Sequence, residues 1–213
     1  MNEPSQTSTY GWGKNVSHCH SYIDPAILDA VRSVAAKKIM DLGCGNGTLC
    51  GYLHAKGFAV EGCEPDAAGV ITARQSFPDI TFHQTGVYDD PKLPKGSFDV
   101  VVSTEVIEHL YAPEYLPQFA RKVLAPGGHL IVSTPYHGYL KNVLISLLGK
   151  WDFHHHPAST GRHIKFWSRQ TLTAFLSEHG FTVRQFIGVG RVRWLWKAMI
   201  LVAQLNEQPH ASS

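Results

Sequence analysis

The sequence has few cysteines, few charges and no hydrophobic run long enough to span a membrane. Its four cysteines, at positions 19, 44, 50 and 63, include no C-x-x-C pair and do not suggest a disulfide framework. Charged residues make up 17% of the chain and the net charge is only +2. This charge gives no strong reason to expect nucleic acid or an anionic membrane as a partner. Residues 1–9 are polar and lack the apolar core of a signal peptide. We therefore expect a cytoplasmic protein with reduced thiols.

What is present is typical of one globular domain. The chain has 213 residues, of which 44% are hydrophobic, enough for a sizeable core. Strand-like and helix-like segments alternate, which predicts a doubly wound α/β sheet with its ligand at the carboxyl ends of the strands. We expect an N-terminal tail over 1–22, one domain over 23–206 with a cap insertion at about 136–165, and a C-terminal tail over 207–213.

Two segments outside this alternation are candidates to cover a ligand. Residues 10–22 carry three aromatic residues and two histidines without clear periodicity. The segment 136–151 contains an apolar helical stretch around 143–148. Each segment could close over the site as a lid or pack on the core as ordinary structure.

Residues 38–47, K-I-M-D-L-G-C-G-N-G, predict a buried strand followed by a glycine turn, and 48–55 has the spacing of a helix. Glycines allow the backbone to approach a ligand closely, and the helix that follows directs unpaired N–H groups toward it. Such a unit is first interpreted as a nucleotide site.

Two acidic residues refine this interpretation. Asp41 lies two positions before the first glycine, where it would repel pyrophosphate and attract an ammonium or sulfonium group. Glu64 closes the next predicted strand, about 20 positions after the glycine turn, where it can accept hydrogen bonds from ribose hydroxyls. A cationic tail joined to a ribose describes S-adenosylmethionine.

Four motifs in order resemble those of the class I S-adenosylmethionine-dependent methyltransferases. They are D-L-G-C-G-N-G at 41–47, E-P-D at 64–66, S-F-D-V-V-V at 97–102 and L-A-P-G-G-H-L at 124–130. The resemblance implies a seven-stranded Rossmann-like sheet of order 3-2-1-4-5-7-6 with strand 7 antiparallel and helices on both faces. The motifs are specific for the family but are much less specific for the methyl acceptor.

The resemblance also implies a set of cofactor-binding residues. The loop 86–90 corresponds to the family's adenine-binding loop, although a solvated turn is an equal alternative for Asp89. The implied cofactor contacts are Asp41, Gly43, Cys44, Gly45, Asn46, Gly47, Glu64, Pro65, Val87, Tyr88, Asp89 and Glu105.

Some boundaries follow from local signals. Asp24 is expected to cap a helix with Pro25 at its first position. The run Pro126-Gly127-Gly128 is expected to interrupt the chain before a strand at 129–134. The adjacent histidines at 154–156 are expected to form a loop that faces water.

A second group of polar residues follows the fourth predicted strand. The segment T-E-V-I-E-H-L at 104–110 would place Glu105 and His109 one turn apart if it is helical. Its E-x-x-E-H pattern resembles the ubiquinone-biosynthesis O-methyltransferases and the small-RNA 3′-terminal 2′-O-methyltransferases, both of which use a divalent ion. In the second subgroup a further histidine follows strand five, and His163 takes that position here.

The resemblance therefore predicts one Mg²⁺ or Mn²⁺ ion, bound by Glu105, Glu108, His109 and His163. The same pattern also occurs in methyltransferases without a metal. In that case His109 or His163 could be the general base that takes the proton of an oxygen nucleophile.

The leading functional hypothesis is O-methylation of a small molecule such as a catechol, diol or sugar. Trp194-Leu195-Trp196 could line its pocket or pack as ordinary core. One alternative is an RNA ribose 2′-O-methyltransferase, which the near-neutral charge and the lack of an appended RNA-binding domain make the weaker hypothesis. The other is a non-catalytic S-adenosylmethionine-binding protein. The sequence does not indicate the oligomeric state.

Overall fold

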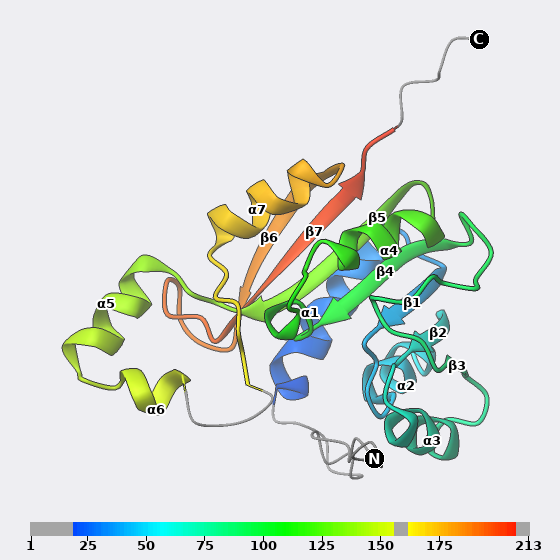
Figure 1. Ribbon diagram of the computed structural model, residues 1–213, viewed down its shortest axis with the longest axis horizontal. Coiled ribbons are helices and arrows are strands. Elements are labelled where there is room, and N and C mark those ends of the chain that lie inside the picture. Colours follow the sequence, from blue (N-terminus) through cyan, green and yellow to red (C-terminus); the bar gives the residue numbers. More distant parts are fainter. Residues whose placement is uncertain (1–18, 156–161, 208–213) are drawn as a thin grey trace, which may run out of the picture.

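The computed structural model describes residues 19–155 and 162–207 as a single twisted sheet with helices on both faces (Figure 1). The strands are β1 Lys38–Leu42, β2 Ala59–Cys63, β3 Thr81–His83, β4 Phe98–Thr104, β5 Leu124–Pro135, β6 Phe181–Val189 and β7 Ala198–Leu205. The helices are α1 His20–Ser33, α2 Thr48–His54, α3 Ala67–Ser76, α4 Tyr115–Val123, α5 Tyr139–Leu147, α6 Trp151–His155 and α7 Arg169–Glu178. A 3₁₀ turn, η1, spans Ile107–His109. None of the helices in these ranges is long and apolar enough to cross a bilayer.

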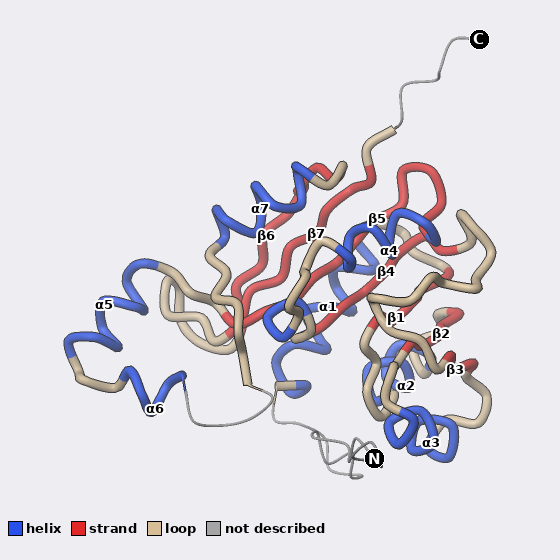
Figure 2. The backbone as a smooth tube through the Cα atoms, viewed as in Figure 1, coloured by secondary structure: helices blue, strands red, loops and turns tan. Residues whose placement is uncertain are grey.

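The sheet has the order β3-β2-β1-β4-β5-β7-β6, as expected. The pairs among β1 to β5 are parallel, whereas β7 pairs antiparallel with both β5 and β6. Because parallel strands share one direction, the loops that follow β1, β2, β4 and β5 lie at the same edge (Figure 2). This edge is where a ligand site is expected.

Two apolar layers hold the helices against the sheet. One joins residues of α1, α2 and α3 to one face, and Ile27, Leu53 and Val102 are among its fully buried members. The other joins α4 and α7 to the opposite face through residues such as Phe119, Leu176 and Val101. In Figure 1 α4 and α7 lie in front of the sheet and α1 behind it.

The first helix begins earlier than expected. The predicted start at Asp24 is wrong, because α1 begins at His20 and includes Pro25. His20 and Asp24 lie one turn apart and form a hydrogen-bonded ion pair, 2.9 Å from Nδ1 to Oδ1. This pair and the burial of Ile23 stabilise the turn that precedes the proline.

The fifth strand also differs from its predicted bounds. β5 begins at Leu124, before Pro126, so the expected interruption lies within the strand rather than ahead of it. Leu124 pairs with Phe98, and the next pair is His129 with Val100, so residues 125–128 form an irregularity in the ladder. Gly127, with a φ of 72°, provides the left-handed residue that this bend needs.

Two other helices begin at side-chain caps, and the histidine run at 154–156 was expected to form a loop. Ser168 caps α7 by accepting a hydrogen bond from the N–H of Thr171, and Asp66 caps α3 in the same way from Ala68. Histidines 154 and 155 differ from expectation, because they lie in α6 rather than in a loop, and the ring of His155 stacks on His137 at 5.6 Å. The third, at 156, lies outside the described residues, as do residues 10–18 of the expected lid.

Candidate active site

A cavity of about 460 Å³ opens at the edge of the sheet where β1, β2 and β4 end. It joins residues that are far apart in the sequence, from α1, the glycine turn, the end of β2 and the segment after β4. Eight of the predicted cofactor-binding residues line it: Asp41, Gly43, Cys44, Gly45, Asn46, Glu64, Pro65 and Glu105.

The glycine turn bends around the end of β1. The N–H groups of Gly43 and Cys44 both donate to the carbonyl of Cys63, at 2.8 and 3.0 Å, which fixes the turn to β2. Gly43 has a φ of 85°, and a Cβ there would lie 2.5 Å from Val106. Glycine is therefore needed for the close approach of the turn to the segment after β4. Gly47, the left-handed N-cap of α2, is the predicted residue of this turn that does not line the cavity.

Glu64 is held by two backbone amides. Its Oε2 accepts from the N–H of Gly45 and its Oε1 from that of Asp66, each at 3.0 Å. Each carboxylate oxygen keeps acceptor capacity for a ligand hydroxyl. Burial raises the pKa of Glu64, and the two amides counteract that rise.

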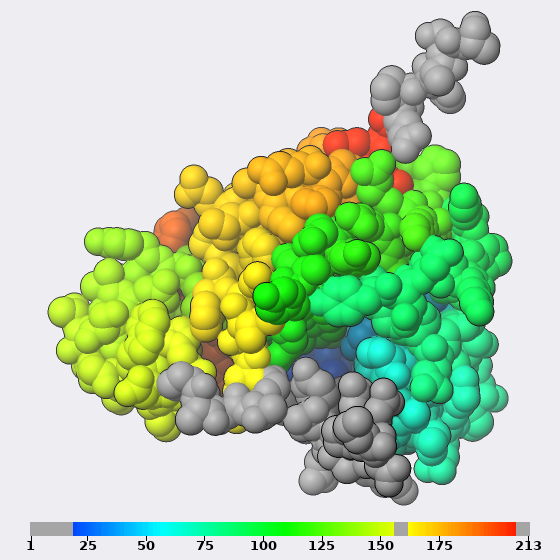
Figure 3. Space-filling view, in the orientation of Figure 1, coloured from blue at the N-terminus to red at the C-terminus, as the bar shows by residue number. Residues whose placement is uncertain are grey.

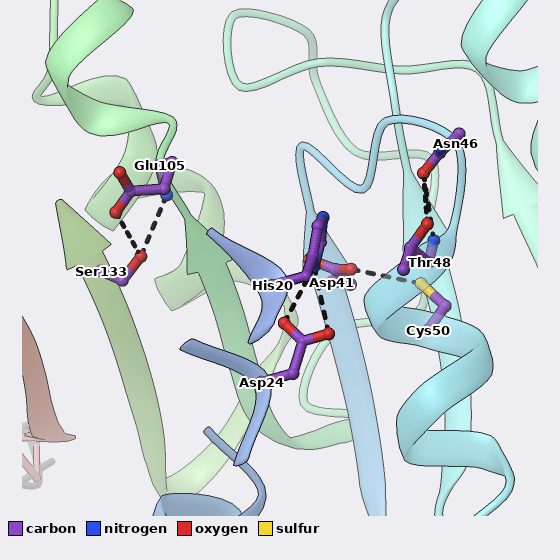
Figure 4. Close-up of polar contacts among 8 residues, drawn as sticks. All are labelled: His20, Asp24, Asp41, Asn46, Thr48, Cys50, Glu105 and Ser133. Carbon is purple, nitrogen blue, oxygen red and sulfur yellow. Dashed lines mark hydrogen bonds and ion pairs between the residues drawn. The ribbon is translucent and has the colours of Figure 1, made fainter. Parts of the chain in front are cut away.

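Asp41 lies at the end of β1 with its side chain fully buried. One carboxylate oxygen, Oδ2, accepts a weak hydrogen bond from the Cys50 thiol at 3.3 Å, as Figure 4 shows. The other, Oδ1, is buried and has no hydrogen-bond partner among the described residues. Burial raises the pKa of Asp41 to about 7. A buried carboxylate oxygen without a partner needs a hydrogen-bond donor, and an ammonium group in the cavity could donate to Oδ1 of Asp41.

Helix α1 supplies residues that sequence reasoning missed. His20, Ile23 and Asp24 of α1 line the cavity, together with Cys19, which directly precedes the helix. Figure 4 shows the His20–Asp24 pair beside Asp41. Their hydrogen bond is the main reason that the pKa of His20 is raised. The available signal was the position of His20 in the aromatic and histidine-rich segment 10–22.

The predicted adenine loop lies outside this cavity. Val87, Tyr88 and Asp89 line a separate hollow of about 410 Å³ together with residues of α4. Asp89 Oδ2 accepts from the N–H of Gly86 at 2.7 Å, which closes the turn. Gly86 in turn packs on Pro65, so the loop begins next to a cavity residue. A role for the three residues in cofactor binding stays a prediction.

The structure brings three of the four predicted metal ligands together. One ligand atom from each of Glu108, His109 and His163 lies within 4.8 Å of the others. The N–H groups of Ile164 and Lys165 donate to the carbonyl of Glu108, at 2.8 and 3.0 Å, and so fix the segment carrying His163 against η1. His109 also lines the main cavity, which places this group at its wall.

The donors of this group suit a cation. Glu108 is fully buried, Thr134 donates to its Oε2 at 3.1 Å, and its Oε1 accepts no hydrogen bond from the described residues. Burial, followed by the charge of Glu105, raises the pKa of Glu108. Burial also lowers the pKa of His163 to about 4, so its imidazole is neutral and free to coordinate at neutral pH.

Glu105 turns away from that group of three. Its φ is 54°, and the segment after β4 forms a bend and η1 rather than the helix that would align Glu105 with His109. Ser133 donates its hydroxyl to Glu105 Oε1 at 2.9 Å (Figure 4). Burial raises the pKa of Glu105 to about 7. The carboxylate lines the cavity of about 460 Å³, as expected for one of the predicted cofactor contacts, whose role in binding stays a prediction.

Comparison with known proteins identifies the family of the chain. Residues 17–185 match the family model of a methyltransferase domain. The chain therefore belongs to the class I S-adenosylmethionine-dependent methyltransferases, and S-adenosylmethionine is its methyl donor.

Among curated proteins, it is 28% identical over 176 residues to a ubiquinone biosynthesis O-methyltransferase of Marinobacter nauticus, covering 79% of this chain and 71% of that protein. Two solved structures share the fold. The methyltransferase domain of bacterial CtHen1-CN is 25% identical, with a TM-score of 0.64 over 86% of this chain and 97% of that one. An S-adenosylmethionine-dependent methyltransferase of Mesorhizobium loti is 21% identical, with a TM-score of 0.65 over 84% and 96%.

Proposed function

We propose that this protein transfers the methyl group to an oxygen of a small molecule that carries two neighbouring oxygens, such as a catechol or a vicinal diol. The observation that carries the proposal is the position of His109, which belongs both to the cofactor cavity and to the group with Glu108 and His163. A cation held there would lie beside the transferable methyl group. The name of the Marinobacter relative supports oxygen as the acceptor atom.

Each group of residues has a task in this proposal. When bound, S-adenosylmethionine supplies an activated methyl group and a divalent ion supplies a positive charge that acidifies the acceptor hydroxyl. Asp41 would face the ammonium group of the cofactor, and Glu64 would accept from its ribose hydroxyls. The task left to the protein is alignment and the exclusion of water.

The ion would be bound by Glu108, His109 and His163, with Glu105 as a fourth ligand if it leaves Ser133. A carboxylate with imidazoles suits Mn²⁺, and further oxygen ligands would suit Mg²⁺. Three or four protein ligands leave at least two of six octahedral positions for two acceptor oxygens. This geometry favours neighbouring hydroxyls over a lone amine.

Chelation tests the proposal. Protein dialysed against a chelator should still bind S-adenosylhomocysteine in calorimetry but should not methylate catechol, and Mn²⁺ or Mg²⁺ should restore turnover. Binding of Mn²⁺, followed by its electron paramagnetic resonance signal, should be lost in Glu108→Gln and His163→Ala. His54→Ala, which changes an exposed histidine of α2, is the matched control.

Full activity in excess chelator would contradict the metal and leave His109 or His163 as a general base. The same assay with an RNA that ends in a ribose diol separates the alternatives. Methylation of RNA but not of catechol would favour the ribose 2′-O-methyltransferase. Cofactor binding without transfer to catechol, RNA or a cell extract would favour a non-catalytic binding protein.

A further inference from the structure

A hollow of about 280 Å³ lies between the start of α7 and the loop that joins β6 to β7. Figure 3 shows orange-red atoms of this loop at the surface, between the lobe formed by the helical hairpin α5–α6 and the yellow residues that lead into α7. The hollow shares no lining residue with the cavity at the ends of β1, β2 and β4. Its walls are mostly aromatic and consist of Tyr136, Phe186, Trp194 and Trp196.

Close packing fixes these walls. The ring of Trp196 lies against Gly188 of β6, where an added Cβ atom would overlap it. A glycine within a strand often marks such a close approach of another group. Tyr136 and Phe186 meet the Trp196 ring edge-on, with centroids 5.1 and 5.4 Å away, an arrangement that aromatic rings favour. The hollow is therefore preformed on this side, which lowers the entropic cost of binding a ligand.

Trp194 completes the wall from a strained position. Its φ is 71°, in the left-handed region that bulky residues rarely adopt. The ring lies at the rim of the hollow, 5.8 Å from that of Trp196, and is 51% exposed. Burial in the core does not account for a strained tryptophan that is half exposed. Backbone strain of this kind is concentrated at functional sites, ligand sites included.

Two arginines give the hollow a positive charge. The guanidinium of Arg169, the first residue of α7, lies 4.7 Å from the centre of the Phe186 ring, and that of Arg193 lies 4.8 Å from the Trp194 ring. No carboxylate lines the hollow, and neither arginine forms an ion pair with any residue that the structure describes. A stacked guanidinium presents its face to the ring, so the N–H groups along its edge remain for an anion.

The charge and the size of the hollow select the ligand. Aromatic walls alone would also suit a quaternary ammonium group, but two guanidiniums repel a cation. At about 280 Å³ the hollow lies just below the range of about 300–1,000 Å³ that is typical of ligand pockets, so it suits one ring rather than several. A carboxylate attached to an aromatic ring is coplanar with it. The whole ligand can therefore stack on the walls while it accepts hydrogen bonds from the guanidinium edges.

We propose that this hollow is a second ligand site, which binds a small aromatic carboxylate. The ring of the ligand stacks among Tyr136, Trp194 and Trp196, and its carboxylate accepts hydrogen bonds from the two arginines. The ligand thereby bridges the start of α7 and the β6–β7 loop. The site is separate in its residues from the cofactor cavity, and the proposal does not rest on the identity of the methyl acceptor.

Fluorine nuclear magnetic resonance of 4-fluorobenzoate with the full chain tests this site. One ring and one carboxylate should give a Kd of about 1 mM or less, measured from the broadening of the fluorine signal. 4-Fluorobenzyl alcohol, which keeps the ring and lacks the charge, should bind at least about tenfold more weakly. The double variant Arg169→Gln, Arg193→Gln should lose a similar factor in affinity for 4-fluorobenzoate. Arg184→Gln, at an exposed position of β6 outside the hollow, is the matched control and should bind as the wild type does.

Trp194→Gly separates a ligand site from ordinary packing. Glycine suits a φ of 71°, so this variant should fold with an unchanged or higher melting temperature. Loss of the ring should nevertheless weaken binding of 4-fluorobenzoate about fivefold. The melting temperature and the affinity for S-adenosylhomocysteine show that each variant is folded.

Three results would overturn the proposal directly: no binding of 4-fluorobenzoate, equal affinity for the alcohol, or unchanged affinity in the double arginine variant. Displacement of 4-fluorobenzoate by S-adenosylhomocysteine or by catechol would also overturn it, because the probe would then lie in the cofactor cavity or at the methyl acceptor. Displacement by inorganic phosphate at equal concentration would overturn it as well and assign the two arginines to a phosphate ligand.

Discussion

Asp41 combines full burial with a carboxylate oxygen that has no hydrogen-bond partner in the part of the chain that the structure describes. Burial raises its pKa to about 7, so near neutral pH the cofactor-free protein carries a mixture of the neutral and ionised forms. A positively charged ammonium group in the cavity binds the ionised form better. Protonation of Asp41 should therefore oppose cofactor binding.

We expect the affinity for S-adenosylhomocysteine to be about tenfold lower at about pH 6 than at about pH 8, because the bound proton must then be released at a cost of about 1.4 kcal/mol per pH unit below the pKa. Asp41→Asn should bind more weakly at the higher pH and should lose most of this dependence. Calorimetry at both pH values, on the wild type and on the variant, measures the affinity and its pH dependence. Equal pH dependence in the variant would show that another group is responsible.

The individual residues of the site could be predicted to different extents. Asp41, the glycines and Glu64 were predictable because they lie within one strand–turn–helix unit and at the end of the next strand, where the fold fixes their positions. His20 and Asp24 were not, because their place beside Asp41 depends on how α1 packs across the sheet. Glu105 was assigned to the metal by the family resemblance of its motif and by its spacing from His109, but its positive φ turns its carboxylate toward Ser133.

At the scale of elements, α1 shows how a side-chain pair moves a boundary. The signal Asp24-Pro25 is that of a helix start, but the His20–Asp24 pair and buried Ile23 favour one more turn. The segment after β4 shows the opposite case, where an expected helix becomes a bend and a 3₁₀ turn. In this segment the N–H of Glu105 donates to the carbonyl and the hydroxyl of Ser133 on β5. These tertiary contacts override the helical pattern of the local sequence.

The ion pair between His20 and Asp24 predicts that the stability of α1 depends on pH. The pKa of His20 is raised in the folded protein, so its contribution is fully present below the unfolded value of about 6.5 and is lost as the pH rises through the raised pKa. Asp24→Asn should lower the free energy of unfolding by about 1 kcal/mol near pH 6, and by less at higher pH. Asp29→Asn, at an exposed position of the same helix, is the control and should show no such trend. Urea denaturation without cofactor measures both, and a constant difference for Asp24→Asn would contradict the assignment.

At the scale of the whole molecule, the strand order was predictable because the four motifs resemble one family throughout. The direction in which the hairpin α5–α6 projects was not predictable. An apolar helical pattern indicates that a face is buried but does not indicate which part of the protein it packs against. The insertion was expected to cap the site, yet none of its described residues lines the cavity at the ends of β1, β2 and β4. A closing movement of this hairpin therefore stays a prediction.

The continuous sheet predicts that cofactor binding stabilises the whole domain. The cavity is built by α1, β1, β2 and β4, whereas Trp151, Trp167, Trp194 and Trp196 all follow β5. In a Trp12→Phe background, tryptophan fluorescence therefore reports only on the half without the cavity.

S-adenosylhomocysteine at about 100 times its Kd should add about 2.7 kcal/mol to the free energy of unfolding. If the domain unfolds as one unit, fluorescence and far-ultraviolet circular dichroism should shift together, and both shifts should be smaller in Glu64→Gln, which binds the ribose less well. A shift in circular dichroism without one in fluorescence would show that the two halves of the sheet unfold separately.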